Sequence, residues 1–196
     1  GVTFEVETYR KNRAVVTIGL VAANAVRFQM FPYGNTDCVR NEVFSFAEQE
    51  KAAISETEDL ICICGGQVEV RIRKHPWEVS YYCDGRLITK EQVRDSNVDN
   101  MCKNLPIGFT LDEKKRVRKV HETMYLYADE SFYGFGEKFT DFDKRGQTIH
   151  CWQTDALSTN TERSYKNHPF FISSRGYAML LNSFTRSRFD MGTVSG

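Results

Sequence analysis

Short segments in which apolar and polar residues alternate recur along most of this 196-residue chain. The clearest one, Gln67 to Arg73, has the sequence Q-V-E-V-R-I-R and follows the glycine pair Gly65 and Gly66. Alternation with a period of two places apolar side chains on one face of a strand, and a two-glycine turn is typical of a β-hairpin. Only Lys90 to Asn100 is predicted to be helical or irregular, and it lacks a regular apolar stripe. The chain is therefore predicted to be all-β.

Turn residues separate the predicted strands at intervals of roughly eight to twelve residues, a spacing typical of an antiparallel β-sandwich. No internal repeat, low-complexity tract or linker divides the chain. We therefore predict a single domain of this architecture, residues 1–196. The predicted strands are Val2–Thr8, Ala14–Leu20, Ala25–Phe31, Glu42–Ala47, Ala52–Glu56, Asp59–Cys64, Gln67–Arg73, Trp77–Cys83, Arg86–Thr89, Ile107–Leu111, Arg116–Val120, Thr123–Tyr127, Gln147–Trp152, Pro169–Ile172, Tyr177–Leu181 and Arg186–Met191.

The charges of the chain balance, with 26 Lys and Arg against 26 Asp and Glu. A net charge of zero gives no reason to expect binding to nucleic acid or to an acidic membrane. Hydrophobic residues make up 41% of the chain, which suffices for a packed core and excludes a disordered chain. No apolar run approaches the roughly 18 residues of a membrane span, and the first residues lack the order of a signal peptide. We expect no membrane partner.

The six cysteines do not form a metal-binding pattern. Cys62 and Cys64 lie on the same face of a predicted strand, where parallel side chains rarely bridge, and the others are scattered (Cys38, Cys83, Cys102 and Cys151). There is no C-x-x-C pair and no histidine at ligand spacing, so a zinc site is not expected. The pair Gly134 and Gly136 lacks the third glycine and the following helix of a nucleotide loop. We predict reduced thiols, a cytoplasmic protein and no cofactor.

Residue types that bear on function are dense only between Ser131 and Asn182. The segment Tyr133 to Glu137 places two glycines among aromatic residues, which predicts a backbone in tight contact with a neighbour or at positive φ. Further on, the polar loop Gln153 to Asn167 connects two predicted strands and carries Asp155 among small hydroxyl residues. Polar loops held between strands are common places for binding residues.

Four ordered motifs in this stretch resemble the N-terminal β-sandwich of glycoside hydrolase family 31. They are YGFGEKF at 133–139, QTD at 153–155, TNTERSYKNHPFF at 159–171 and SRGYAMLLN at 174–182. Within the family they are most similar to the α-xylosidase branch. The resemblance implies a galactose-mutarotase-like supersandwich, and it covers about a quarter of the chain.

Members of this family hydrolyse α-glycosidic bonds, with retention, by means of two aspartates on a (β/α)8 barrel downstream of the sandwich. The chain shows no alternation of strands and helices and no nucleophile segment of that barrel. The resemblance therefore implies a non-catalytic domain of an α-xylosidase or α-glucosidase, with no catalytic residue of its own. Its expected partners are the barrel, which it would brace, and an α-glycoside substrate, to which it would lend a loop.

Asp155 is the first candidate for substrate binding, because one carboxylate can bind two sugar hydroxyls. In the resembled family, the acid at the matching position binds the sugar on the leaving-group side. Trp152 and Tyr165 flank the loop and could stack on sugar faces. The alternatives are a solvated turn-capping role for Asp155 and a core position for the two aromatic residues. Thr154 and the pair Ala156-Leu157 depart from the family pattern, which leaves the preferred sugar open.

Other candidate sites are rejected. Glu137, Asp141 and Asp143 lie in or beside a polar connection and are not expected to form the carboxylate pair of a glycosidase. None of the histidines His121, His150 and His168 has a nucleophile at partner spacing. The basic run 113–119 is predicted to be a solvated hairpin tip.

A free-standing carbohydrate-binding module is the alternative function. Such a module should expose aromatic residues along one strand face, whereas these aromatics fall mainly at alternating positions expected in the core, Phe4, Phe28, Phe44 and Phe46. The pattern therefore favours the domain of a glycosidase. A sandwich separated from its barrel is further expected to expose an apolar docking patch and to self-associate.

Overall fold

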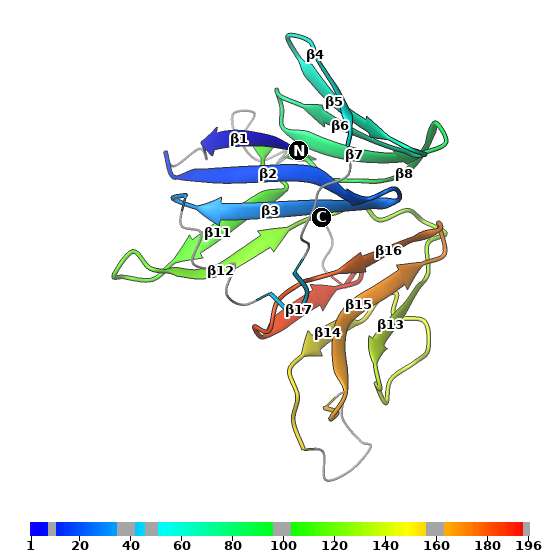
Figure 1. The fold of residues 1–196 in the computed structure, drawn as a ribbon. Helices are drawn as coiled ribbons and strands as arrows, with labels where there is room; N and C mark the ends of the chain where they lie inside the picture. The colour runs from blue at the N-terminus through cyan, green and yellow to red at the C-terminus, as the bar shows by residue number, and fades with distance from the viewer. Residues whose placement is uncertain (8–10, 35–41, 46–50, 96–102, 156–162, 194–196) are drawn as a thin grey trace. The chain divides into compact units, whose positions relative to one another are not determined.

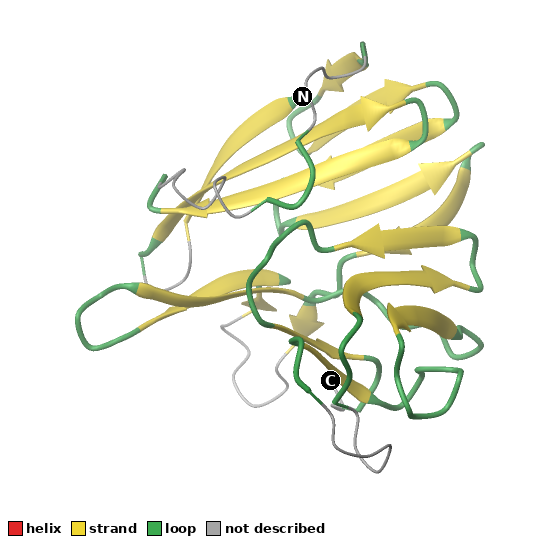
Figure 2. Cartoon of the chain, turned by 60° about the horizontal axis from the view of Figure 1, so that its bottom comes forward, coloured by secondary structure: helices red, strands yellow, loops and turns green. Residues whose placement is uncertain are grey.

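The computed structural model describes residues 1–7, 11–34, 42–45, 51–95, 103–155 and 163–193. All regular elements in these ranges are β-strands and all strand pairs are antiparallel, so the all-β prediction is confirmed (Figure 2). No helix in the described ranges could cross a membrane. The chain forms two compact units, Gly1–Cys38 with Phe46–Tyr125, and Val39–Ser45 with Leu126–Gly196, and each is described by itself. The single domain 1–196 stays a prediction.

The first unit contains a three-stranded sheet and a five-stranded sheet, with consecutive strands side by side in each (Figure 1). The three-stranded sheet consists of β1 (Val2–Glu7), β2 (Arg13–Ala22) and β3 (Ala25–Pro32). The five-stranded sheet consists of β4 (Ala53–Glu56), β5 (Leu60–Gly65), β6 (Val68–Arg73), β7 (Glu78–Cys83) and β8 (Arg86–Lys90). Two pairs complete the unit: β9 (Arg94–Asp95) with β10 (Lys103–Asn104), and β11 (Ile107–Leu111) with β12 (Val117–Glu122).

The two larger sheets of this unit share one hydrophobic core. Alternate residues of β2, among them Val16 and Ile18, pack with Ile63 and other buried residues of the five-stranded sheet. Phe4 joins this core through an edge-on contact with the Trp77 ring, with centroids 5.4 Å apart. Two antiparallel sheets that bury their facing side chains form a sandwich, as the alternating pattern predicts.

The second unit consists of two small sheets around an aromatic core. β13 (Phe132–Gly136), β15 (Asn167–Ser173) and β16 (Tyr177–Leu180) form one sheet in the order β13-β15-β16, and β14 (Thr148–Cys151) pairs with β17 (Ser187–Asp190). The Phe171 ring lies 5.5 Å from each of the Phe132 and Phe135 rings. In a core of this size, burial of such aromatic rings is the main contribution to the stability of the unit.

The opposite face of the β13-β15-β16 sheet is also apolar, and we call it the outer face. Directly paired residues of antiparallel strands share a face, which places Ile172 beside Tyr133 and Ala178, and Phe170 beside Leu180. Phe142, 82% exposed, lies with its ring 5.1 Å from that of Tyr133, and Ile172 is 50% exposed. The outer face thus consists of Tyr133, Phe142, Phe170, Ile172, Ala178 and Leu180.

Two predicted strands are wrong where the structure describes them. Residues 42–45 are not a strand, because the backbone amides of Val43 and Phe44 donate to the Asn182 side chain at 2.9 and 2.8 Å instead of to a neighbouring strand. Phe44 is 53% exposed and is therefore not a core residue, whereas Phe4 and Phe28 pack on the core as expected. Phe46 and Ala47 lie outside the described residues.

The second wrong strand is Thr123–Tyr127, which forms only one isolated bridge, between Met124 and Glu91. The Tyr125 amide donates to the Lys90 carbonyl and the Gln92 amide to the Thr123 carbonyl, both at 2.8 Å, and the boundary between the two units falls directly after Tyr125. The segment predicted to be helical or irregular contains the short strand β9 in its described part, and residues 96–100 lie outside the description. The basic run forms the β11–β12 turn and its flanks, as predicted.

Glu91 is a fully buried acid in the first unit. Its Oε2 accepts a hydrogen bond from the Val79 amide at 2.7 Å, and its Oε1 has no partner among the described residues. Burial, and then the neighbouring Glu122, raises the pKa of Glu91 to about 9. A carboxyl group in this environment is neutral near pH 7, because an unpaired buried charge is too costly.

This raised pKa predicts a pH-dependent stability. Below pH 4.5, the ordinary pKa of this carboxyl group, Glu91 is protonated in both the folded and the unfolded chain. Between pH 4.5 and about 9 the unfolded chain has lost the proton, whereas the folded chain still holds it. The free energy of unfolding should therefore fall between these values, by at most about 1.4 kcal/mol per pH unit from this group. Above about pH 7, where Glu122, whose pKa is raised to about 7, adds little further slope, Glu91→Gln should flatten the pH dependence and be more stable than the wild type at pH 8 in urea titrations. The exposed control Glu58→Gln should keep it, and equal slopes in all three proteins would contradict the argument.

Candidate functional site

The predicted sugar-binding residues all lie on the exposed surface of the β14–β15 connection. Trp152 is 55% exposed and Tyr165 53% exposed, so the core alternative for the two aromatic residues is wrong. Asp155 is exposed as well. Residues 156–162, which include Ala156-Leu157 and the hydroxyls at 158, 159 and 161, lie outside the described residues. Binding by Asp155, Trp152 and Tyr165 stays a prediction.

The two sides of this connection are joined at its base. The Thr154 amide donates to the Ser164 carbonyl at 3.2 Å, which brings together the residues that immediately precede Asp155 and Tyr165. Ser164 itself is buried, although its neighbours are exposed. Asp155 and Tyr165 therefore each follow a backbone position that is hydrogen-bonded to the other side of the connection.

Asn167, at the start of β15, was not predicted as a functional residue. Its Nδ2 donates to the carbonyls of Trp152 at 3.0 Å and Ser164 at 2.7 Å. Its Oδ1 accepts hydrogen bonds from the Ser164 hydroxyl at 3.3 Å and from the Lys138 ammonium. In the sequence, the only sign of this role is a polar residue just before an apolar run, which is common at any strand start.

The close backbone contact predicted for the glycine pair of β13 is confirmed. Gly134 and Gly136 have φ angles of 134° and 79°. A Cβ atom on Gly134 would lie 2.6 Å from the Phe170 carbonyl oxygen, and one on Gly136 would overlap the carbonyl of Lys166. Only glycine fits such an approach at positive φ. Phe135 between them points its fully buried ring into the core, with its own φ at 67°.

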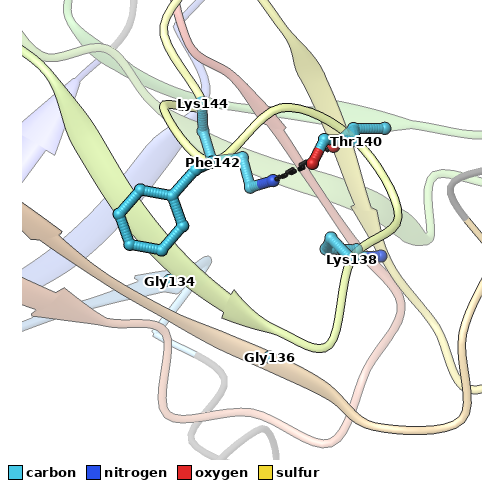
Figure 3. Close-up of a pocket in the computed structure, with 6 residues that line it drawn as sticks. All are labelled: Gly134, Gly136, Lys138, Thr140, Phe142 and Lys144. Carbon is cyan, nitrogen blue, oxygen red and sulfur yellow. Dashed lines mark hydrogen bonds between the residues drawn. The ribbon is translucent and has the colours of Figure 1, made fainter.

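A cavity of about 220 Å³ lies beside this glycine pair (Figure 3). Its lining residues are Gly134, Gly136, Lys138, Thr140, Phe142 and Lys144. The buried Lys144 ammonium donates to the Thr140 carbonyl at 3.3 Å, to the Thr140 hydroxyl at 3.1 Å and to the Asp141 carbonyl. Burial lowers the pKa of Lys144. These three acceptors use all three ammonium protons, so this lysine stabilises the connection after β13.

Two of the acids that are not expected to be catalytic, Asp143 and Glu137, have structural contacts. Hydrogen bonds from the Ser131 hydroxyl and from the backbone amides of Arg145 and Phe132 lower the pKa of Asp143. Glu137 forms an exposed ion pair with Lys166 at 3.2 Å. Asp143 is therefore an acid that fixes a turn, and the surface pair contributes little stability.

The described cysteines, Cys62, Cys64, Cys83 and Cys151, are free thiols, and Cys38 and Cys102 lie outside the described residues. In the described ranges, no three His, Cys, Asp or Glu residues come together as possible metal ligands.

Comparison with known proteins gives a match to a family model over residues 15–190, described as the glycosyl hydrolase 31 N-terminal galactose mutarotase-like domain. The chain is 28% identical over 144 residues to the α-xylosidase XylQ of Lactiplantibacillus pentosus, which covers 73% of this chain and 17% of that protein. It is 27% identical over 202 residues to α-glucosidase 2 of Bacillus thermoamyloliquefaciens, with 98% and 24% covered. The chain therefore spans less than a quarter of the length of these relatives.

Solved structures show the same fold. The cycloalternan-forming enzyme of Listeria monocytogenes, solved with a pentasaccharide substrate, matches with a TM-score of 0.75 at 21% identity, covering 97% of this chain and 17% of that enzyme. An α-xylosidase of glycoside hydrolase family 31 from a soil metagenome, solved with xylose, matches with a TM-score of 0.73 at 16% identity, covering 98% and 29%.

The glycine pair of β13 generates a test of the contact between β13 and β15. Gly136→Ala should lower the free energy of unfolding by about 3 kcal/mol or more, because strain at positive φ adds to the overlap with Lys166. Gly146→Ala is the matched control, since Gly146 has a φ of 74° but nothing within 4 Å of an added Cβ, and should cost only about 1 kcal/mol. Urea unfolding measures both. Equal losses would mean that the close approach is unimportant.

Proposed function

Because the chain belongs to the glycosyl hydrolase 31 N-terminal galactose mutarotase-like domain family, we propose that it is a non-catalytic domain of a retaining α-glycosidase. The proposed substrates of the whole enzyme are α-xylosides or α-glucosides, which the names of the relatives support. Two roles are proposed for this chain: a loop that contacts the sugar and a surface that braces the catalytic barrel. The cytoplasmic location stays a prediction.

The observation that carries the sugar-contacting role is the exposure of all three predicted residues on a loop with a fixed base. An exposed carboxylate such as Asp155 can accept hydrogen bonds from two neighbouring sugar hydroxyls. The exposed rings of Trp152 and Tyr165 have the flat apolar surface that packs on a sugar ring. The backbone bond between Thr154 and Ser164 reduces the loss of conformational freedom on binding.

The outer face supports the bracing role. A sheet that is apolar on both sides is normally covered on both sides, because an uncovered apolar face remains in contact with water. The inner side is covered by the aromatic core, and Phe142, Ile172 and Leu180 are exposed on the outer face. We infer that the barrel of the whole enzyme covers this face.

The same face discriminates against the alternative, a free-standing carbohydrate-binding module. Phe142 and Phe170 are exposed aromatic residues on one face, as that alternative requires. Ile172, Ala178 and Leu180 lie between or beside them, however, and these aliphatic side chains offer sugar neither a flat ring nor a hydrogen bond. A mixed aliphatic and aromatic surface is typical of contacts with protein.

The sugar-contacting role predicts the effect of Asp155→Asn in a polypeptide that carries this domain together with its barrel. Loss of the charged hydrogen bonds should lower kcat/KM for an aryl α-xyloside or α-glucoside by about 10- to 100-fold. Asp129→Asn, at another exposed acid of the same unit, should leave kcat/KM unchanged. Unchanged kinetics in both variants would exclude Asp155 from the site.

The non-catalytic assignment predicts that the purified 196-residue chain does not hydrolyse an aryl α-xyloside or an aryl α-glucoside. Release of the chromophore above the buffer rate, in a preparation checked for contaminating glycosidases, would overturn the assignment.

The bracing role predicts self-association of the isolated 196-residue chain through the outer face. Sedimentation velocity should show a concentration-dependent dimer, and the double variant Phe142→Ser with Ile172→Thr should shift it toward monomer. Ile54→Thr, at an exposed isoleucine of β4 in the first unit, is the matched control and should associate like the wild type. A wild type that remains monomeric at high concentration would contradict an exposed docking face.

A further inference from the structure

We propose that Asn167 and Lys138 are positioning residues that hold the Asp155 loop in place through one fully hydrogen-bonded side-chain amide. This inference rests on the proposed function, in which that loop contacts the sugar. Neither residue is placed at the sugar itself. They act through the backbone of the two segments that carry Trp152, Asp155 and Tyr165.

The Asn167 amide contacts both sides of the loop. Its two N–H groups donate to the carbonyls of Trp152 and Ser164, and its oxygen accepts from the Ser164 hydroxyl and the Lys138 ammonium. Two donors and two lone pairs are all that a side-chain amide has, so every one of its hydrogen bonds is used. Because Asn167 is almost fully buried, the loss of any of these partners leaves a polar group without water to replace it.

Lys138 determines the orientation of the Asn167 amide, that is, which side its oxygen and its nitrogen occupy. Its ammonium group also donates to the His150 carbonyl of β14 at 2.7 Å, so the lysine links the connection after β13 to β14 and to β15. A cation next to the amide requires the oxygen of Asn167 at that position, which directs the nitrogen to the two loop carbonyls. The positive charge also polarises the amide and strengthens its N–H groups as donors.

The consequence reaches Asp155 through the backbone. With the carbonyls of Trp152 and Ser164 attached to one amide group, the Thr154 amide lies 3.2 Å from the Ser164 carbonyl and closes the base of the loop. Asp155 follows Thr154 directly, and Tyr165 follows Ser164. A residue in direct contact with a sugar binds it well only when neighbouring contacts hold that residue within a fraction of an ångström of its binding position.

We call the hydrogen bonds that join the Asn167 side chain to Lys138, Trp152 and Ser164 the clamp. Three variants of the 196-residue chain test it. Asn167→Asp has the same shape and retains an acceptor for Lys138, but it replaces both donors by an oxygen that faces two carbonyl oxygens. Lys138→Met removes the cation that orients the amide. Lys138→Arg retains a positive charge and should therefore keep part of this orienting effect. Lys166→Met is the matched control, because that exposed lysine lies next to Asn167 in the sequence and its ammonium forms an ion pair with Glu137 at 3.2 Å.

Amide hydrogen exchange measured by NMR gives a readout that does not depend on sugar. In Asn167→Asp and Lys138→Met, exchange at the Thr154 amide should accelerate about tenfold or more, because the loop opens without global unfolding. Exchange at the Ile172 and Met179 amides of the same sheet should stay within a factor of two or so of wild type, which shows that the unit remains folded. Unchanged exchange at Thr154 in both variants would overturn the proposal.

Kinetics of the whole enzyme separates this inference from the proposed function. If the loop contacts sugar, Asn167→Asp should raise KM or lower kcat. The dependence of the rate on pH should stay the same, since the clamp residues transfer no proton in the reaction. Faster exchange at Thr154 with unchanged kinetics would support the clamp and overturn the role of the loop. Changed kinetics for Asp155→Asn with unchanged exchange in the clamp variants would support the role of the loop and overturn the clamp.

Discussion

The close approach of the β13 backbone to β15 is the constraint on which the second unit depends. Gly134 and Gly136 allow the carbonyls of Phe170 and Lys166 to occupy the space that a side chain would fill. This approach positions Phe135 over the core and brings β15 next to the connection that contains Lys138. The aromatic core and the anchored loop base therefore both depend on a contact made by backbone atoms.

Most of the fold could be predicted from local pattern because most strands have one buried face. The alternation in β6 and the glycine turn before it identify that hairpin without any knowledge of its neighbours. The failures lie where partners come from elsewhere in the chain. Residues 42–45 resemble a strand in composition, but their amides bond to Asn182, about 140 residues further on, and local pattern carries no information on such a partner.

The candidate site was predictable only in part for the same reason. Asp155, Trp152 and Tyr165 could be selected because of a motif and because polar loops between strands often bind ligands. The Asn167 amide could not, since its four partners come from residues 138, 152 and 164, which only the folded chain brings together. A single asparagine before an apolar run has no distinctive spacing. Side chains that hold the binding residues in place without contacting the ligand are in general harder to predict than those that contact it.

The apolar character of both faces of β15 has a consequence for strand register. In most strands, a slip by one residue would turn the core side chains toward water, and this cost alone enforces the correct pairing. In β15 the sequence Phe170-Phe171-Ile172 would present an apolar residue to the core in either register. Hydrophobicity therefore specifies the alignment of this strand only weakly. The unique fit of the two glycines and the single set of partners available to Asn167 must supply the specificity that the pattern of side chains lacks.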